Sequence, residues 1–290
     1  MSTRRQTIEQ ILAAITPLYD PSEALNIAEM VICDREDISR SQLVVFPDEE
    51  SKIDNLDTLI TELASGRPVQ YILGYGEFYG ERFAVGEGVL VPRPETEELV
   101  AWISNDIIET ANKELFTNHK TKILDLCTGS GCIAISLARE VAGSEITALD
   151  ISPEALHYAR KNAVRLAPQI TIIEGDVLAG AENFINDSFD VIVSNPPYIP
   201  ASDITEMHTN VRDFEPHRAL FVADERPLIF YEAIADSALK LLRAGGKLYF
   251  EIYEKLGDEL CEMLRQKGFT DVILRRDLND KPRMICCRKP

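Results

Sequence analysis

The stretch KILDLCTGSGCIAISLARE, residues 122–140, decides the fold of this chain. It opens with the short apolar run Lys122–Leu126, which is typical of a buried parallel strand. Gly129 and Gly131 permit a tight turn after this strand and a close approach of the backbone to a ligand. A helix is predicted to follow over Cys132–Glu140. Strand, glycine turn and helix in this order indicate a cofactor-binding α/β unit.

Six further strands follow this unit in the chain. They are predicted over Glu145–Leu149, Ile170–Glu174, Phe189–Ser194, Gly246–Ile252, Thr270–Leu274 and Arg283–Cys287. The first five strands alternate with helical segments, which predicts an α/β fold with a doubly wound, seven-stranded, mainly parallel sheet of Rossmann-like type. A turn around Asn279-Asp280 joins the last two strands, so we expect an antiparallel hairpin at the edge of the sheet.

The chain ahead of the strand Lys122–Leu126 has a different sequence pattern. Between residues 5 and 66, apolar residues recur at helical spacing and prolines separate the segments, which predicts several helices. Between Pro68 and Pro94, aromatic and β-branched residues separated by glycines predict a hairpin. A further helix is predicted over Thr96–Thr110, where apolar residues share one face. A small helical domain and a hairpin are therefore expected ahead of the sheet.

The composition is that of an ordinary soluble globular protein. Of the 290 residues, 45% are hydrophobic and 27% are charged, and no apolar run approaches the roughly 20 residues of a membrane span. Glu9 and Gln10 interrupt the apolar stretch of Met1–Ile15, so we expect a helix there rather than a signal peptide. The six cysteines and four histidines show no metal-ligand spacing, so no metal site is expected, and reduced thiols in a cytoplasmic protein are favoured.

The charge balance argues against a nucleic-acid partner. The chain contains 30 Lys and Arg against 48 Asp and Glu, which gives a formal net charge of −18. Such a surface repels phosphate backbones unless a local basic patch overrides it. The longest basic clusters are the pairs Arg4-Arg5 and Arg275-Arg276. Direct nucleic-acid binding is therefore disfavoured, and no membrane partner is expected.

The glycine turn alone leaves two cofactors open. Gly129–Ala134 fits the pattern G-x-G-x-x-A, which cannot by itself separate a nicotinamide enzyme from an S-adenosylmethionine enzyme. Asp125 favours the second, because a carboxylate there would attract a cationic amino-acid group and repel a pyrophosphate; it could equally organise the loop by accepting backbone N–H bonds. Asp150 ends the second strand, where it can accept hydrogen bonds from both ribose hydroxyls. Asp176 ends the third strand and could recognise an adenine amino group or cap a helix.

The tetrapeptide Asn195-Pro196-Pro197-Tyr198 carries the strongest chemical signal. It follows the predicted strand Phe189–Ser194, at the edge where α/β sheets bind their ligands. The side chain of Asn195 and the backbone of Pro196 offer two carbonyl acceptors in a rigid segment whose prolines cannot donate. Two acceptors side by side suit an –NH₂ group, and the Tyr198 ring can cover a flat substrate. On its own, the segment is also compatible with a plain proline-rich turn.

Four segments together resemble one enzyme family. They are Gly66–Gly74 (GRPVQYILG), Val91–Glu97 (VPRPETE), Asn195–Pro200 (NPPYIP) and Glu215–Leu220 (EPHRAL). With the glycine turn and the acidic strand ends, they resemble the release factor glutamine methyltransferase family (PrmC/HemK) of class I S-adenosylmethionine-dependent methyltransferases, over nearly the whole chain. The Asn-Pro-Pro-Tyr element alone is shared with adenine-N6 methyltransferases of DNA or RNA, which are the main alternative. An intact element beside an intact glycine turn disfavours a protein that binds the cofactor without chemistry.

The resemblance implies a reaction and a domain division. The cofactor would be S-adenosyl-L-methionine. The substrate would be the Gln of the Gly-Gly-Gln motif in peptide chain release factors, methylated on its side-chain amide nitrogen (N5). A helical substrate-binding domain is expected over 1–75, a β-hairpin linker over 76–95 and the methyltransferase domain over 96–290. We expect a monomeric, cytoplasmic enzyme.

The same resemblance implies the site. The expected cofactor-binding residues are Asp125, Cys127, Thr128, Gly129, Ser130, Gly131, Asp150, Asp176, Val177 and Asn195. The expected catalytic residues are Asn195, Pro196 and Tyr198, and the expected substrate-binding residues are Asn195, Pro196, Pro197 and Tyr198.

Two segments depart from the family pattern. Family members often carry Glu-Ile-Gly after the fifth strand, where this chain has Glu251-Ile252-Tyr253. Ala223–Leu228 also departs from the more usual Asp-Gly-Leu. Both departures lie outside the reacting residues, so they bear on loop packing more than on the reaction.

Four charged residues lie within these signatures. Arg93 and Glu95 either order the loop over the cofactor or pair with each other across a tight turn. Glu215 is expected to form a local pair with Arg218.

Overall fold

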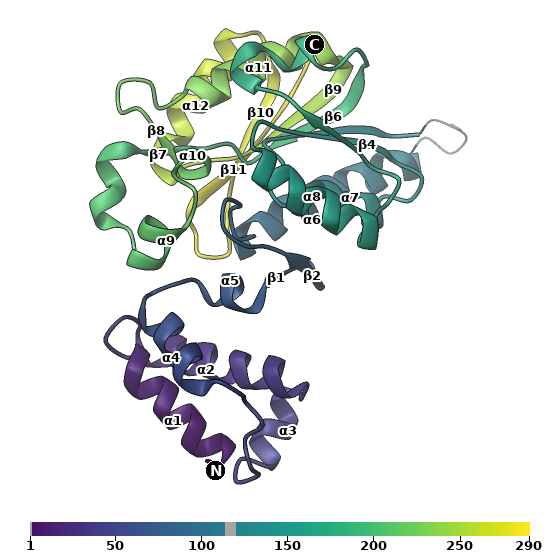
Figure 1. The fold of residues 1–290 in the computed structure, drawn as a ribbon. Coiled ribbons are helices and arrows are strands. Elements are labelled where there is room, and N and C mark those ends of the chain that lie inside the picture. The colour runs from purple at the N-terminus through teal and green to yellow at the C-terminus, as the bar shows by residue number, and fades with distance from the viewer. Residues whose placement is uncertain (1, 114–119) are drawn as a thin grey trace. The chain divides into compact units, whose positions relative to one another are not determined.

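A computed structural model describes residues 2–113 and 120–290, which form two compact units. The first unit runs to Tyr75 and includes the distant segment Met207–Phe214, and the second comprises Gly76–Glu206 and Glu215–Pro290. Figure 1 shows the helices of the first unit and the mixed sheet and helices of the second. Each unit has its own core.

The first unit consists of helices, as the spacing of its apolar residues predicts. They are α1 (Arg4–Ile15), α2 (Pro21–Glu36), α3 (Arg40–Val45), α4 (Leu56–Ala64), α5 (Val69–Leu73) and α9 (Thr209–Phe214). Thr3 caps α1 and Asp20 caps α2 by accepting backbone N–H bonds. Ile11, Val31 and Leu63, from three different helices, are buried together in one core.

The segment Met207–Phe214 joins this unit from far along the chain. The ring of His208 stacks on Tyr19 with centroids 5.1 Å apart, and its Nε2 lies 2.6 Å from the backbone oxygen of Leu18. The boundary expected from the sequence leaves this segment with the sheet, because contacts over such a separation leave no local signal. The functional division into 1–75, 76–95 and 96–290 stays a prediction.

A short hairpin opens the second unit. Strands β1 (Tyr75–Phe78) and β2 (Glu81–Ala84) pair with each other, as predicted. Tyr79 and Gly80 turn the chain between them with φ of +50° and +75°. The left-handed conformation at both positions is typical of a two-residue hairpin turn.

The seven-stranded sheet expected from the sequence is present. Its strands are β3 (Lys122–Leu126), β4 (Glu145–Asp150), β5 (Thr171–Glu174), β6 (Phe189–Ser194), β9 (Leu242–Glu251), β10 (Thr270–Arg276) and β11 (Pro282–Arg288). They lie in the order β10-β11-β9-β6-β3-β4-β5. β9, β6, β3, β4 and β5 are parallel, whereas β11 is antiparallel to both β9 and β10. The hairpin at the sheet edge is therefore confirmed.

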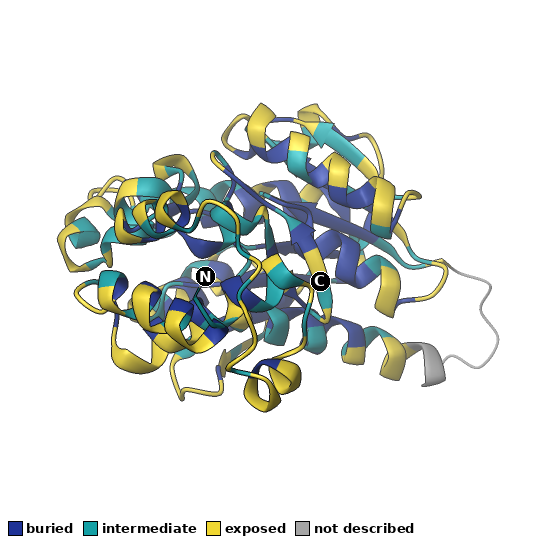
Figure 2. Ribbon diagram, turned by 60° about the horizontal axis from the view of Figure 1, so that its bottom comes forward, coloured by how far each residue is buried: buried dark blue, intermediate teal, exposed yellow. Residues whose placement is uncertain are grey.

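Helices cover both faces of this sheet. One face packs on α6 (Pro94–Lys113), α7 (Cys132–Glu140) and α8 (Pro153–Leu166), and the other on α11 (Ile229–Leu241) and α12 (Gly257–Gln266). Neighbouring residues of β3 alternate between the two cores, since Ile123 belongs to the first and Leu124 to the second. The central strands of the sheet are accordingly buried between helices whose outer sides are exposed (Figure 2).

Short elements complete the second unit at the carboxyl edge of the sheet. They are η1 (Val177–Ala179), η2 (Ala181–Asn183), β7 (Ile199–Pro200), η3 (Ala201–Glu206), α10 (His217–Leu220), β8 (Phe221–Val222) and η4 (Glu254–Leu256). β7 pairs with β8 in parallel, which ties the chain after the Asn-Pro-Pro-Tyr element to the chain after α10. Among residues 2–113 and 120–290, no helix combines the length and apolar character that a membrane crossing needs.

Candidate active site

A cavity of about 240 Å³ lies where the carboxyl ends of the parallel strands meet. Gly88–Arg93 and the glycine turn after β3 line it, together with the ends of β4 and β5. Asn195 and Pro197 after β6 also line it, as do Thr96, Pro216, Arg218, Ala219 and Phe230. The loops that follow neighbouring parallel strands share one edge of a sheet, so this site follows from the topology.

The glycine turn brings backbone, rather than side chains, to the cavity. Gly129 and Gly131 have φ of +57° and +82°, a conformation that side chains disfavour. A Cβ at Gly131 would lie 3.1 Å from Cδ1 of Ile135, whereas a Cβ at Gly129 would meet no protein atom within 4 Å. Gly129 also lines the cavity. The two glycines thus have different roles: Gly131 lets α7 pack closely, and Gly129 leaves space for a ligand.

Asp125 lies beneath this turn and is fully buried. Its Oδ2 accepts hydrogen bonds from Oγ1 of Thr128 at 2.5 Å and from the backbone N–H of Ala134 at 3.2 Å. Its Oδ1 has no hydrogen-bond partner among the described residues, and burial raises the pKa of this carboxyl to about 7. Asp125 is not among the residues that line the cavity. It organises the loop, which is one of the two roles that the sequence left open.

Two further strand-end carboxylates do line the cavity. Asp150 accepts from the backbone N–H of Gly129 at 2.8 Å and of Ser152 at 2.9 Å, one bond on each oxygen, and burial raises its pKa. Asp176 caps η1 by accepting from the backbone N–H of Leu178 at 2.8 Å. A carboxylate oxygen has two lone pairs, so both side chains keep acceptor capacity for a ligand.

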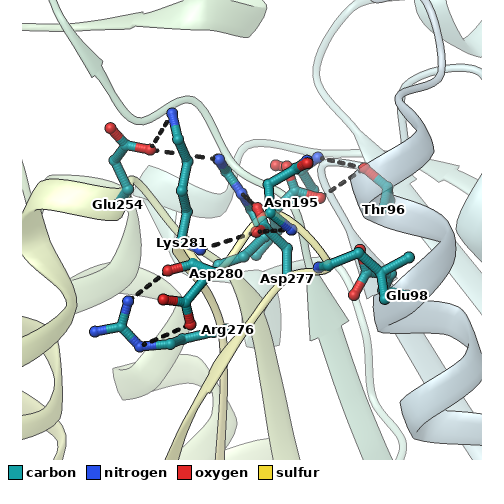
Figure 3. Close-up of polar contacts among 12 residues, drawn as sticks. Thr96, Glu98, Asn195, Glu254, Arg276, Asp277, Asp280 and Lys281 are labelled. Carbon is teal, nitrogen blue, oxygen red and sulfur yellow. Dashed lines mark hydrogen bonds and ion pairs between the residues drawn. The ribbon is translucent and has the colours of Figure 1, made fainter.

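The Asn-Pro-Pro-Tyr element is held by residues from two other parts of the chain. Nδ2 of Asn195 donates to Oγ1 of Thr96 at 3.3 Å, and this hydroxyl donates to Oε2 of Glu251 at 2.6 Å. Figure 3 shows the amide of Asn195 beside Thr96 at the start of α6. The hydroxyl of Tyr198 donates to the other oxygen of Glu251 at 3.1 Å. Glu251 itself is only 2% exposed.

The departure from the family pattern at Tyr253 has a structural counterpart. The ring of Tyr253 stacks on that of Tyr198, with centroids 6.1 Å apart and planes at 15°. The hydroxyl of Tyr253 donates to Asp203, which also accepts from Lys255 at 3.2 Å. The position that is often glycine in relatives therefore supports one face of the predicted catalytic ring.

The charged residues around Val91–Glu97 pair differently from the expectation. Nη2 of Arg93 lies 2.6 Å from Oε1 of Glu215, and Oε2 of the same carboxylate accepts from the backbone N–H of Val91 at 3.2 Å. The expected pair of Glu215 with Arg218 is wrong; Arg218 lines the cavity instead. Because the buried Glu215 binds both Val91 and Arg93, it holds the loop that walls the cavity.

Comparison with known proteins places the chain in a family. Over 95% of its length it is 40% identical to the release factor glutamine methyltransferase of Flavobacterium psychrophilum, and the match covers 95% of that protein. The enzyme of the same name from Bacteroides thetaiotaomicron is also 40% identical, over 96% of this chain and 98% of that one. The chain belongs to the release factor glutamine methyltransferase family. The family resemblance stated from the sequence is confirmed.

Two domain families match within the chain. Residues 6–74 match the PrmC N-terminal domain, and residues 104–211 match the Methyltransferase small domain. A methyltransferase from Pyrococcus furiosus has a similar fold, with a TM-score of 0.50 and 16% identity over 80% of this chain and 98% of that one. That likeness supports the α/β fold class alone.

The residues around the cavity fit S-adenosyl-L-methionine, the methyl donor of this family of methyltransferases. The open space at Gly129 suits close approach of a ligand to the backbone. Asp150 has acceptor capacity for a ribose diol, and Asp176 for an amino group of a base. Asp125 adds a buried carboxylate with one unpartnered oxygen nearby. Membership of this family is inconsistent with the nicotinamide dehydrogenase that the glycine pattern alone leaves open.

Some of the expected site residues lie at the cavity and others do not. Those that line it are Cys127, Thr128, Gly129, Ser130, Asp150, Asp176, Val177, Asn195 and Pro197. Those that do not are Asp125, Gly131, Pro196 and Tyr198. Asp125 supports the glycine turn through hydrogen bonds, Gly131 is part of that turn, and Pro196 and Tyr198 follow Asn195 in the chain.

Sequence reasoning missed the residues that support the site from a distance. Asn162 on α8 donates to the backbone oxygens of Ala84 and Ser130, each at 3.0 Å, and so joins the hairpin to the glycine turn. Thr96 and Glu251 were quoted only as parts of longer segments. A signal for Glu251 did exist, because it is an acidic residue at the carboxyl end of a parallel strand, as is Asp150.

Proposed function

We propose that this chain transfers a methyl group from S-adenosyl-L-methionine to the side-chain amide nitrogen (N5) of the Gln in the Gly-Gly-Gln motif of peptide chain release factors. The names of its relatives and its membership of their family support the substrate. The single observation that supports the chemistry is the orientation of Asn195. Its Nδ2 is bound to Thr96, which leaves Oδ1, beside the cavity, as an acceptor for an –NH₂ group.

The chemistry explains why two acceptors are needed. An amide nitrogen is a poor nucleophile, because its lone pair is delocalised into the carbonyl group. When bound, S-adenosylmethionine supplies a methyl group activated by the positive charge on its sulfur. Oδ1 of Asn195 and the backbone oxygen of Pro196 accept the two N–H bonds of the substrate amide. They thereby orient its lone pair and stabilise the positive charge that develops on nitrogen.

Positioning accounts for much of the proposed rate enhancement. Well-oriented reactants gain roughly 7–11 kcal/mol over free encounter. Tyr198 packs on the planar amide in this proposal, and its ring is held at the hydroxyl by Glu251 and on one face by Tyr253. No general base is required, since the methylated and N-protonated amide is strongly acidic and loses its proton readily.

The remaining assignments follow from the substrate. The helical unit, residues 1–75, grips the release factor, and the hairpin at 76–95 links it to the methyltransferase part. We expect the enzyme to act as a monomer. A substrate that acts in translation termination places the enzyme in the cytoplasm.

Mass spectrometry tests this proposal directly. A purified release factor is incubated with the protein and S-adenosylmethionine, and the peptide that contains the Gly-Gly-Gln motif is analysed. We expect one added methyl group on the Gln side chain. A release factor with this Gln changed to Glu serves as the control and should gain none. Transfer of labelled methyl groups to DNA or RNA instead would overturn the proposal in favour of adenine-N6 methylation.

A further inference from the structure

Glu251 is a buried carboxylate beside the reacting residues, and the proposed mechanism uses only its hydrogen bond to Tyr198. It ends β9, which neighbours β6 in the sheet, and the pairing of Ser194 with Phe250 brings Asn195 and Glu251 to adjacent strand ends. Its side chain is 2% exposed, and its two oxygens accept from Thr96 and Tyr198. Burying a carboxylate is unfavourable unless it gains compensating hydrogen bonds, so the burial of Glu251 at this position indicates a role for its hydrogen bonds.

The positions of the protons fix the direction of the hydrogen bonds that run from Asn195 through Thr96 to Glu251. A carboxylate can only accept hydrogen bonds, whereas a Thr hydroxyl has a single proton to donate. Because Thr96 donates that proton to Glu251, its oxygen can only accept from Asn195. The Asn195 amide must then present Nδ2 to Thr96 and Oδ1 away from it. Without the carboxylate, Thr96 could donate to Oδ1 equally well, and the amide could turn over.

We propose that Glu251 is a positioning residue for methyl transfer: through Thr96 it fixes the Asn195 amide with Oδ1 toward the substrate, and directly it holds the ring of Tyr198. The proposal rests on the proposed function, since it concerns the same acceptor. It assigns to one buried charge the orientation of both side chains that flank the substrate amide. Glu251 contacts these side chains and not the substrate.

Two hydroxyls and a guanidinium offset part of the cost of burying the charge of Glu251. Burial and the nearby charge of Glu95 raise its pKa, while the hydroxyl of Thr96, the guanidinium of Arg283 and the hydroxyl of Tyr198 oppose this shift. Arg283 is itself held by Asp277, with Nε 3.1 Å from Oδ2, and lies 3.7 Å from a carboxylate oxygen of Glu254. Figure 3 labels Asp277 and Glu254 of this cluster, together with Asn195 and Thr96. Two donors aimed at one carboxylate are the arrangement that an anion requires.

Four variants test the proposal. Glu251→Gln keeps the shape but gives the side chain a donor, so that either Thr96 or Tyr198 must reorient. Thr96→Val keeps the branched shape and removes the hydroxyl, whereas Thr96→Ser keeps the hydroxyl. Glu254→Gln is the matched control, because it removes a carboxylate from the same charged cluster without contact to Thr96 or Tyr198.

Turnover of a release factor, its KM, the dissociation constant of S-adenosylmethionine and the thermal unfolding midpoint are measured for each variant. We expect kcat to fall about 10²-fold in Glu251→Gln and in Thr96→Val, the size of effect that small misplacement of a reacting group produces. KM and cofactor affinity should change little. Thr96→Ser should recover most of the turnover, and Glu254→Gln should resemble the wild type.

Three results would overturn the proposal. Wild-type kcat in a folded Thr96→Val protein would remove the link to Asn195. Equal losses in Thr96→Ser and Thr96→Val would assign the effect to packing of the methyl group. If Glu251→Gln fails to fold, the comparison of Thr96→Val with Thr96→Ser still tests whether the Thr96 hydroxyl orients Asn195. A wild-type protein that methylates no release factor would instead refute the proposed function, and this role with it.

Discussion

The two sides of the cavity are built in different ways. On the cofactor side, the glycine turn presents backbone, and its side-chain partners Asp125, Asp150 and Asn162 lie at most 32 positions away from the residues of the turn and of α7 that they bind. On the acceptor side, Asn195 depends on Thr96, which lies 99 positions earlier, and on Glu251, which lies 155 positions from Thr96. The first side is therefore built from a shorter part of the chain than the second.

This difference predicts which substitutions impair each side of the cavity. A backbone site tolerates many side-chain changes but not the loss of a glycine that faces the ligand. A site made of side chains fails when any member of its hydrogen-bonded chain is changed, because the remaining members reorient. Experiments should therefore distinguish the two sides. Changes on the cofactor side should alter the affinity for S-adenosylmethionine, and changes on the acceptor side should alter kcat.

The largest separation is expected for Asn195→Asp. The substitution keeps the size of the side chain but removes the Nδ2 donor to Thr96 and places a second carboxylate near Glu251. We expect kcat to fall by about 10²- to 10³-fold, the cost of losing one oriented group at a developing charge. The affinity for S-adenosylmethionine, measured by calorimetry, should stay near the wild-type value. A wild-type kcat would mean that the hydrogen bond from Nδ2 of Asn195 to Thr96 does not orient the acceptor.

The contrast between local and distant structure also explains what sequence could predict. The strand Lys122–Leu126 and the helix Cys132–Glu140 match β3 and α7 at both ends, because apolar period and glycine spacing are local signals. The mainly parallel sheet followed from the alternation of strands and helices, and the edge hairpin followed from the turn around Asn279-Asp280. The pairing of Arg93 with Glu215 did not, since 122 positions separate them. The roles of the individual site residues stay predictions.

Asp125 provides the next test, because its charge is buried beneath the cofactor side. Its folded-state pKa is about 7, above the ordinary value of 3.8. The folded protein therefore binds a proton there more tightly than the unfolded chain, so this contribution to stability is full below about pH 4 and is lost as the pH rises through 7. Asp125→Asn imitates the protonated form, since its oxygen can keep the bonds to Thr128 and Ala134.

The free energy of unfolding of both proteins is measured by urea denaturation without cofactor between pH 4 and pH 8. Each unit of pKa shift corresponds to about 1.4 kcal/mol, so Asp125→Asn should gain a few kcal/mol relative to the wild type as the pH rises. Parallel pH profiles of the two proteins would show that the carboxyl does not titrate in this range. The test concerns the support of the turn and does not depend on the reaction.

Gly129→Ala should give the converse of the Asn195 result. Its Cβ meets no protein atom within 4 Å, but it adds a methyl group where the cavity needs space, at a φ of +57°. We expect the dissociation constant of S-adenosylmethionine to rise about tenfold, while kcat at saturating cofactor stays near normal. The left-handed backbone at this position should cost about 1–2 kcal/mol of stability.

Gly143→Ala is the matched control, because Gly143 has a φ of +76°, equally free space and no place in the cavity lining. It should lose similar stability and bind cofactor normally; weaker binding in both would assign the effect to strain.

The smallest effect, on the acceptor side, is expected at Tyr253. Aromatic pairs contribute about 0.5–1.5 kcal/mol beyond their buried area, so Tyr253→Leu should lower kcat by roughly two- to tenfold by loosening Tyr198. Tyr253→Phe keeps the stacked ring and loses only the hydrogen bond to Asp203, so it should retain more turnover than the Leu variant. Steady-state kinetics with a release factor, together with cofactor affinity as the control, measure both. If Phe and Leu are equally impaired, Tyr253 acts through Asp203 and the loop around it, and support of the acceptor side would extend from the ring to the 201–206 segment.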